Sequence, residues 1–373
     1  MSGTGQCPLV LKYRIISRRS KSAPARAGGM EKIYYFLNSY MGMYMTQSVL
    51  HSAVAAVLAD FSIAAWGITS PVRRQSMRIG VILLPIIAFP VYQLLNPERG
   101  AFHFRLDALM DSGGWLLMSL WGKVPVILFF FLVLSLTVIV FLFQELIPII
   151  GHTAETVRRR GGNGDDEQGA EEEVALPELY DRTVLVALEG MPGEKPEVII
   201  IDDDDLVVFS STGRVPAVYV STGLIDTLEM DQLRGAIAHE IAHIRRTRRP
   251  VLTFLFVFRV LMFFNPVALF EFRRAVQDEE EICDDEAVRA TGNPAALSSA
   301  LERFLEEDGL GGPDGNKEGE QGAGGIVDYS HDMLIKKRLA RLSSKGQEGK
   351  DGAGSMSFPV FVFCTLALNY YIV

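Results

Sequence analysis

Long uncharged apolar stretches dominate the first 150 residues of the chain. Residues 33–59 carry no charge, and residues 79–95 form a second apolar run that contains Pro85 and Pro90. A third stretch, 124–144, carries no charge and is rich in Val, Ile, Leu and Phe. A helix that crosses a bilayer needs roughly 17–25 apolar residues, and membrane helices tolerate proline. The pattern therefore predicts three transmembrane helices within residues 30–150.

Polar segments divide the remainder of the chain. Residues 1–29 are basic, and Met30 offers a second plausible start, so we expect a disordered tail or a non-native start there. Residues 151–176 pass from three arginines through glycines to an acidic run, which is typical of a solvated linker. Residues 343–357 form a second linker, and the uncharged residues 358–373 are predicted to form a C-terminal transmembrane helix.

The segment 177–342, between the linkers, alternates short strand patterns with helical ones. Residues 197–201, 206–210 and 215–221 predict a short antiparallel sheet, with 215–221 as an edge strand able to pair with an extended peptide. A helix follows at 229–247, and Leu233, Ile237, Ile241 and Ile244 recur at the spacing of a core-facing stripe. We therefore expect a mainly helical α+β domain attached to a multi-span helical membrane protein.

Composition narrows the classes of function. Half of the residues, 49%, are hydrophobic, which fits a membrane protein with a soluble part. The net charge is −9 and no basic stripe with interleaved aromatic residues occurs, so nucleic acid is not an expected partner. Cys7, Cys283 and Cys364 are too few and too scattered for a disulfide framework, as in a reducing compartment.

The predicted helix at 229–247 carries the motif His239-Glu240-x-x-His243. Histidines four residues apart lie one turn apart on one helix face, so both rings can reach one Zn²⁺. Glu240, beside the first histidine, can accept the proton of a water that the zinc activates. The alternative is an ordinary amphipathic helix with two surface histidines.

A third zinc ligand has to come from another segment, and this constrains residues 251–270. That stretch contains one charge, Arg259, so hydropathy alone predicts a fourth span. The next glutamates follow it, and a single crossing would place them across the membrane from the histidines. Asn265-Pro266 interrupts the stretch as a helix boundary would. We therefore expect two helices that meet at a bend, associate with the membrane and return to the same side.

The acidic cluster 278–286 offers several candidates for that ligand, and most of its carboxylates are expected on a solvated face. Glu280 is favoured because its helical neighbours are mostly apolar, whereas those of Glu281 suggest a water-facing surface. The neighbours of Glu280 are Val276, Cys283, Asp284 and Ala287, and those of Glu281 are Gln277, Asp278, Asp284 and Asp285. Asp284 is then expected to hold a histidine N–H behind the ligands.

The run from His239-Glu240-Ile241-Ala242-His243, through Phe264-Asn265-Pro266, to Glu280-Glu281-Ile282-Cys283-Asp284 resembles the BlaR/MecR-type integral-membrane zinc metallopeptidases. More distantly, it is similar to the HtpX and Ste24 proteases. The resemblance covers roughly residues 178–342 and implies a zincin-like domain with one Zn²⁺ per chain.

The resemblance also implies roles for particular residues. His239, His243 and Glu280 would be the zinc ligands, and Glu240 the catalytic base. His331 lies where HtpX-like proteins have a similar histidine, which could stabilise the oxyanion, although an exposed loop histidine is an equal alternative.

Positive charge suggests which side the chemistry faces. If the chain starts near Met30, Arg73, Arg74 and Arg78 lie between the first two spans, and arginines 158–160 follow the third. Both groups then lie on one side, which the positive-inside rule makes cytoplasmic. The basic residues of 1–29 would argue the reverse. We expect a bacterial inner-membrane protein with a cytoplasmic catalytic domain.

The expected function is a membrane-embedded zinc endopeptidase that hydrolyses peptide bonds in cytosolic or membrane-proximal proteins, with regulatory proteolysis as one variant of this function. Its partners would be a protein or peptide substrate and the lipid bilayer. The alternative is a catalytically silent membrane scaffold or signal transducer that keeps the fold. Intact Glu240 and three intact ligands favour the enzyme.

Overall fold

A computed structural model describes residues 36, 39–96, 119–120, 124–143, 178–193, 195–211, 215–247, 251–307, 335–343 and 356–372. Contacts along the chain define two compact units, residues 1–44 and residues 45–373. In the first unit, the Ser39 hydroxyl donates to the carbonyl oxygen of Phe36 at 2.6 Å, at the entrance to the first long helix. That helix crosses the boundary between the two units, and every later helix and strand that the structure describes belongs to the second unit.

Two of the described helices, α2 (Tyr40–Ala65) and α3 (Pro71–Leu95), are long and apolar enough to cross a membrane. Both differ from the predicted spans at their ends. Helix α2 continues past the charged residue Asp60, and α3 begins before its apolar run, so the arginines expected in a loop lie in its first turns. Pro85 and Pro90 lie inside α3.

The other two predicted spans correspond to shorter apolar helices, α6 (Val126–Phe141) and α15 (Ser357–Ile372). Before α6, the start of the predicted third span forms strand β2 (Val124–Pro125), which pairs antiparallel with β1 (Ser119–Leu120). Helix α15 packs on α3, where the Tyr92 hydroxyl donates to the carbonyl oxygen of Leu366 at 2.7 Å. Phe361 is buried against Gly80, whose missing side chain admits the ring.

A three-stranded sheet follows helix α8 (Glu178–Leu188) and consists of β3 (Glu197–Ile201), β4 (Val208–Ser211) and β5 (Ala217–Ser221). The strand positions agree closely with those predicted, but the antiparallel arrangement was wrong. The strand order is β3-β5-β4, with β3 parallel to β5 and β4 antiparallel to it. The hairpin between β4 and β5 is local, whereas β3 pairs with the far side of β5.

This order also makes the predicted edge strand wrong. Because β5 has a hydrogen-bonded neighbour on each side, its backbone cannot pair with a further peptide. The described edges of the sheet are β3 and β4, and β4 packs against the motif helix α10 (Met230–Thr247).

The turn between β3 and β4 is held by side chains at the end of β5. The buried Ser221 hydroxyl donates to the carbonyl oxygen of Asp205 at 2.6 Å and accepts from the amide of Val207 at 3.0 Å. It also accepts from Leu224 N and so caps α9 (Thr222–Thr227). Gly223 lies so close to Asp204 that an added Cβ would be 2.0 Å from its carbonyl oxygen. The acidic turn therefore requires glycine there.

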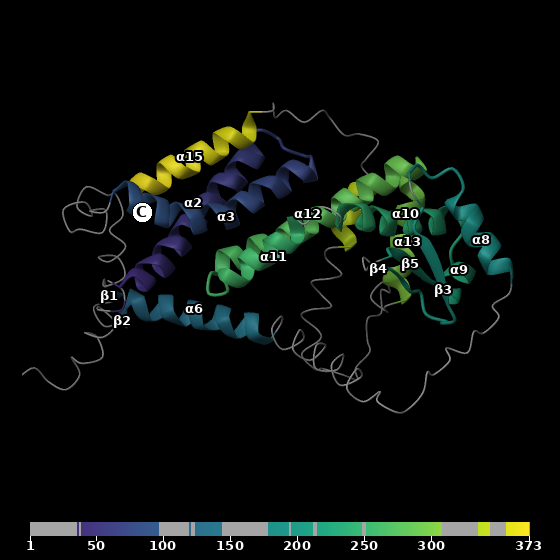
Figure 1. The fold of residues 1–373 in the computed structure, drawn as a ribbon, viewed down its shortest axis with the longest axis horizontal. Helices are drawn as coiled ribbons and strands as arrows, with labels where there is room; N and C mark the ends of the chain where they lie inside the picture. The colour runs from purple at the N-terminus through teal and green to yellow at the C-terminus, as the bar shows by residue number, and fades with distance from the viewer. Residues whose placement is uncertain are drawn as a thin grey trace, which may run out of the picture. The chain divides into compact units, whose positions relative to one another are not determined.

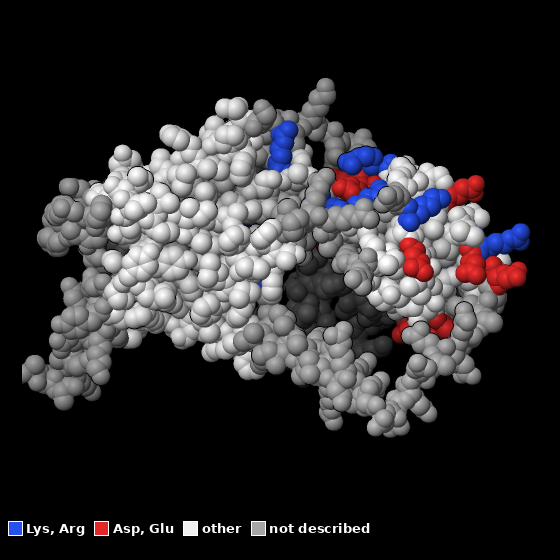
Figure 2. Space-filling view, viewed as in Figure 1, with Lys and Arg blue, Asp and Glu red and all other residues white. Residues whose placement is uncertain are grey.

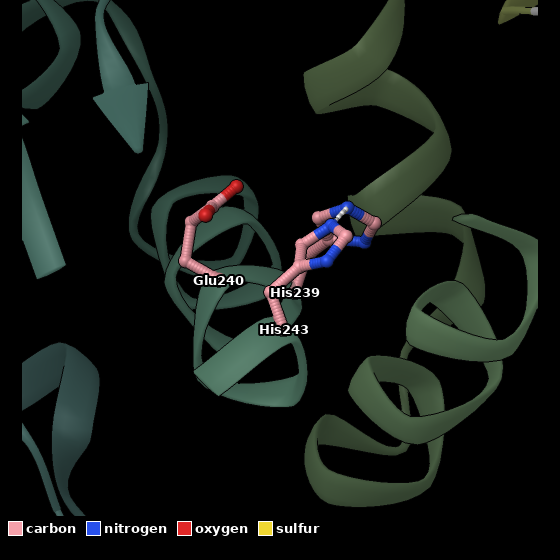
Figure 3. Close-up of side chains that lie close together, drawn as sticks. All are labelled: His239, Glu240 and His243. Atoms are coloured by element: carbon pink, nitrogen blue, oxygen red, sulfur yellow. Dashed lines mark hydrogen bonds between the residues drawn. The ribbon is translucent and has the colours of Figure 1, made fainter. Parts of the chain in front are cut away.

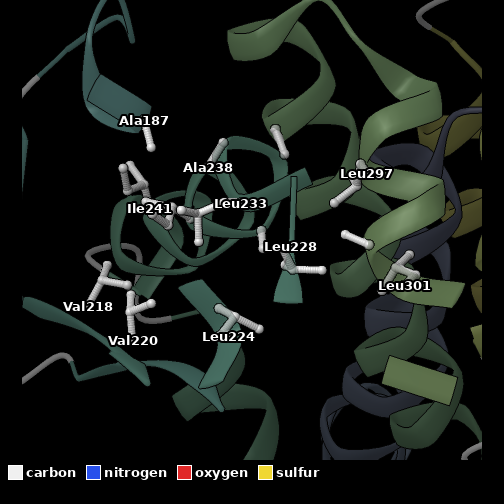
Figure 4. Packing of buried hydrophobic residues seen from close by; sticks show 14 of the residues in the cluster. Ala187, Val218, Val220, Leu224, Leu228, Leu233, Ala238, Ile241, Leu297 and Leu301 are labelled. Carbon is white, nitrogen blue, oxygen red and sulfur yellow. The ribbon is translucent and has the colours of Figure 1, made fainter. Parts of the chain in front are cut away.

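Helix α10 is the centre of the core of this part of the chain (Figure 4). The predicted stripe of Leu233, Ile237, Ile241 and Ile244 is buried, with at most 5% of any of these residues exposed. It packs among the inner face of the sheet, α8 and α13 (Pro294–Glu307). Gly235 allows the backbone of α13 to come close at Leu297. The two faces of α10 are thereby divided between the core and the motif.

After α10 the chain forms α11 (Val251–Leu261), turns, and returns as the long helix α12 (Pro266–Thr291). The break falls where Asn265-Pro266 predicted it. The fully buried Asn265 accepts from the amides of Val267 and Ala268 at 3.0 and 3.3 Å, and donates to the Ser52 hydroxyl of α2 at 2.8 Å. Helix α12 packs on α3 and on α10, so it joins the apolar helices to the motif helix (Figure 1).

Candidate metal centre

His239 and His243 project from one face of α10 and bring their Nε2 atoms to 3.1 Å from one another (Figure 3). Their rings lie edge to face, with centroids 4.7 Å apart. The spacing of four residues produces this arrangement because it places the two side chains one helical turn apart. Burial of the opposite, apolar stripe fixes which way this face of the helix is turned.

The carboxylate of Glu280 reaches both histidines from α12. Its oxygens lie 3.4 Å from Nε2 of His239 and 3.5 Å from Nε2 of His243. A tetrahedral zinc ion has ligands at about 2.0–2.1 Å, which places those ligands about 3.3 Å from one another. The three observed separations fit that geometry, and the two imidazoles and one carboxylate are donors that zinc prefers. The donor set is therefore compatible with zinc.

Glu240 lies on the adjoining side of α10 and is partly buried (Figure 3). One of its oxygens comes within 4.8 Å of the ligand atoms of both histidines, so these three residues also form a possible metal-binding group. Glu280 approaches the histidines more closely, which favours Glu280 as the third ligand.

Each histidine has a partner on its second ring nitrogen, and both partners come from α12. The Asp284 carboxylate lies 3.0 Å from Nδ1 of His239, at ion-pair distance, although without a linear hydrogen bond. The Cys283 sulfur lies 3.5 Å from Nδ1 of His243. Partners at Nδ1 hold the ring so that Nε2 faces the other donors. Asp284 was expected in this position, whereas the contact of Cys283 was not foreseen.

Arg338 completes the site from the helix at 335–343. Its Nε and Nη2 atoms donate to the two oxygens of Asp284 at 2.9 and 2.7 Å. Its Nη1 lies 3.2 Å from an oxygen of Glu280, and Nη2 lies 3.4 Å from Nε2 of His239. Arg338 lies in a basic stretch, residues 336–341, and was not among the residues assigned to the site from the sequence. The basic residues were a signal in the sequence, but the sequence does not show which acidic residues they contact.

These contacts shift the protonation of the site. Burial lowers the pKa of His239, but its contacts with Asp284 and Glu280 outweigh burial and raise the pKa to about 9. Burial raises the pKa of Asp284, but its contact with His239 and the hydrogen bonds from Arg338 outweigh burial and hold the pKa at about 2. Burial also raises the pKa of Glu280, but its hydrogen bonds with His239 and His243 outweigh burial and lower the pKa. Burial raises the pKa of the Cys283 thiol.

The remaining acidic residues of α12 do not form the predicted solvated face. Asp278, Glu279 and Glu281 are each at most 4% exposed, whereas the side chain of Glu280 is 34% exposed. Basic residues from other helices neutralise them: Arg74 and Arg78 of α3, Arg246 of α10, and Lys337 and Arg341 of the helix at 335–343. The helical neighbours of Glu281 suggested a water-facing position, because the basic residues that cover its carboxylate lie far from it in the sequence.

Charged side chains are concentrated around this region. Figure 2 shows the Lys, Arg, Asp and Glu residues of this view gathered over the part of the chain that holds α8–α10, while the surface over α2, α3, α6 and α15 is nearly free of them. His331 lies outside the described residues, as do arginines 158–160. A role for His331 stays a prediction.

Comparison with known proteins supports the predicted family resemblance. The family model described as BlaR1 peptidase M56 matches residues 209–295, which include the motif, the bend and Glu280. The chain is 31% identical over 166 residues to the "Protease HtpX homolog" of Salinibacter ruber, covering 37% of this chain and 58% of that protein. It is 29% identical over 166 residues to the homologue of Tropheryma whipplei (strain TW08/27), covering 34% of this chain and 56% of that protein.

A shorter match, 40% identical over 77 residues, covers 20% of this chain and 26% of the HtpX homologue of Acidiphilium cryptum. The chain thus spans little more than half the length of the first of these relatives. No solved structure gives a significant match. The resemblance to BlaR- and HtpX-type membrane metallopeptidases is therefore confirmed for the segment around the candidate metal centre.

Proposed function

We propose that this protein is a membrane-embedded zinc endopeptidase, in which His239, His243 and Glu280 hold one Zn²⁺ per chain. The observation that carries the proposal is the set of three distances between the donor atoms, 3.1, 3.4 and 3.5 Å. The two histidines lie on one helix, whereas Glu280 comes from another helix and lies 37 or more positions after them in the sequence. The similarity to proteins named as HtpX proteases, and the M56 match over the same residues, support it.

A bound zinc ion would supply a Lewis acid that lowers the pKa of water towards neutrality and polarises a peptide carbonyl. The residues of the chain perform the other parts of the reaction. Glu240 would accept a proton from the attacking water and deliver it to the leaving amine. Asp284 and Cys283 orient the two imidazoles, and Arg338 fixes Asp284. His331 is a further candidate for stabilising the oxyanion.

The substrate would be a protein or peptide bound in extended form. Strand β4 is an edge of the described sheet and packs beside the motif helix, so its free backbone groups are suited to pair with such a peptide. The role that β5 was expected to have therefore passes to β4. Regulatory proteolysis of a cytosolic or membrane-proximal protein is the setting we favour.

We further propose that the catalytic segment faces the cytoplasm of a bacterial inner membrane, with α2, α3, α6 and α15 as spans. The chain would associate with the membrane in α11, turn at the bend and return to the same side in α12. Arg74 and Arg78 of α3 form ion pairs with α12 close to Glu280. These arginines therefore lie on the same side as the metal centre, and the positive-inside rule makes that side cytoplasmic.

The alternative function is a silent scaffold or signal transducer that keeps this fold. The experiment compares the full chain with Glu240→Gln in detergent, measuring zinc content and cleavage of denatured and membrane protein substrates. We expect one zinc per chain in both and cleavage by the wild type alone. Zinc in both with cleavage by neither would support the scaffold, and no zinc in the wild type would overturn the proposal.

A further inference from the structure

The first turns of the membrane helix α3 carry three polar side chains on one face, directed at the helix that bears Glu280. Arg74, Gln75 and Arg78 follow the helix start at Pro71, and their spacing places them together. Gln75 and Arg78 are buried, at 5% and 8% exposure. They lie outside the most apolar part of α3, at the end that meets α12.

These side chains bind the residues on either side of Glu280. Arg74 donates to Glu281 in a close ion pair, and its Nε lies 3.0 Å from Asp278. Gln75 Nε2 donates to the Glu279 carboxylate at 2.7 Å. The two neighbours of Glu280 along the chain, Glu279 and Glu281, are thus both held by α3.

Arg78 extends the same contact towards the start of α12. Its Nε lies 2.8 Å from Asp278 and its Nη1 lies 2.9 Å from Glu271, both buried carboxylates. Contacts at three successive turns of α12 oppose its rotation about its own axis as well as its displacement.

Glu279 also links α3 to the motif helix. Arg246, three residues after His243, donates to Glu279, with Nη2 at 2.7 Å from one oxygen. That oxygen is the same one that accepts from Gln75. One buried carboxylate therefore connects α3, α10 and α12 immediately beside the metal centre.

The position of Glu280 depends on the rotation of α12, because its carboxylate has to reach histidines that belong to the neighbouring helix α10. Neighbouring residues of a helix are turned by about 100° from one another, so fixing residues 279 and 281 fixes the direction of residue 280. A misplacement of about 1 Å in a catalytic arrangement can cost about 100-fold in rate.

We propose that Arg74 and Gln75 of the membrane helix α3 are positioning residues for the metal centre: by holding Glu281 and Glu279 they set the direction in which Glu280 meets the histidines. This inference rests on the proposed function, since it concerns the same site. It makes a membrane segment part of the apparatus that shapes the metal site.

The test uses two conservative variants of the full chain in detergent, Arg74→Lys and Gln75→Leu. Lysine keeps the charge but loses the planar fork that joins Glu281 to Asp278, and leucine keeps the bulk of Gln75 without its donor. The matched controls are Arg274→Lys, whose guanidinium joins α12 to Asp60 of α2 at 3.0 Å, and Gln47→Leu, a buried glutamine of α2.

Cobalt(II) is the probe, because its visible absorption depends on coordination geometry, and zinc affinity is measured by competition with a chelator. For both α3 variants we expect an altered cobalt spectrum, zinc affinity lowered about tenfold or more, and a lower kcat with KM changed less than about twofold. Both controls should keep the wild-type spectrum and affinity. Thermal unfolding of all five proteins reports separately on the fold.

Wild-type cobalt spectra and affinities in both α3 variants, whatever their thermal stability, would overturn the inference while leaving the proposed function intact. Equal losses in the controls and in the α3 variants would also overturn it, because the effect would then be general destabilisation. A wild-type protein that binds neither cobalt nor zinc would instead overturn the proposed function, and this inference with it.

Discussion

Asp284 lies 3.0 Å from Nδ1 of His239, and both residues are almost completely buried. The carboxylate thus faces the ring nitrogen opposite the one that faces Glu280 and His243. A partner of this kind fixes the orientation of a metal-binding histidine and raises its basicity as a ligand. Among the residues that are not ligands, Asp284 is therefore the one whose removal should weaken metal binding most.

Replacing Asp284 with asparagine should therefore weaken zinc binding by about 10- to 100-fold. Chelator competition on the purified full chain measures the change. Asp285→Asn is the matched control, because the neighbouring carboxylate pairs with Arg341 at 2.7 Å. Equal affinity of Asp284→Asn and the wild type would show that Asp284 does not support the metal site.

Zinc affinity should depend on pH through His239, whose pKa in the metal-free protein is raised to about 9. Below that pH zinc has to displace a proton, so the affinity should rise about tenfold per pH unit between pH 7 and 9 and then level off. The protonated ring also stabilises the metal-free fold. Because its folded pKa lies above the ordinary value of 6.5, that stabilisation is complete below pH 6.5 and is lost as pH rises through 9.

Chelator competition at pH 7, 8 and 9, together with chemical unfolding of the metal-free protein, measures both effects. In Asp284→Asn the plateau of affinity should move to lower pH, since the contact that raises the pKa is weakened. Zinc affinity that stays constant from pH 7 to 9 in the wild type would contradict the pKa shift.

Removing the charge of Arg338 should destabilise the protein strongly. Arg338→Met leaves Asp284, which is 1% exposed, without its bidentate partner, and breaking a buried ion pair costs about 3–5 kcal/mol. Arg303→Met is the control, because Arg303 and Glu306 form an exposed pair worth at most about 1 kcal/mol. Denaturant unfolding of the metal-free proteins compares the two, and similar small losses would refute the role given to Arg338.

Ser221→Ala should also reduce stability, by about 1–3 kcal/mol. The buried hydroxyl satisfies the amides of Val207 and Leu224, and alanine would leave these donors without that partner. Thermal unfolding is the measurement, with Ser343→Ala as control, because that exposed hydroxyl donates to the carbonyl oxygen of Ala340 and has no other hydrogen bond within the described residues. An unchanged unfolding temperature for Ser221→Ala would show that the turn does not depend on this residue.

Local periodicity was enough to predict the elements around the motif. The stripe of Leu233, Ile237, Ile241 and Ile244 set the extent and the buried face of α10, and Asn265-Pro266 marked the break before α12. The order of the strands was not predictable in this way. Nothing in the residues of β3 indicates that it pairs with β5 rather than with β4, which follows it along the chain.

The candidate site shows the same division between local and distant information. His239 and His243 lie on one helix, so their spacing alone brought them together. The closeness of Glu280 was predicted from the apolar character of its helix face, although Val276 on that face is exposed. The burial of Glu281 was missed because Arg74 and Lys337 lie 207 positions before it and 56 after it.

The most direct test of the metal centre is the zinc X-ray absorption spectrum of the purified full chain. The site proposed here predicts one zinc per chain, with nitrogen and oxygen neighbours at about 2.0–2.2 Å and no sulfur. It also predicts that Glu280→Gln lowers zinc occupancy whereas Glu240→Gln does not. A sulfur neighbour at about 2.3 Å would make Cys283 a ligand and contradict the proposed set, as would full occupancy in Glu280→Gln.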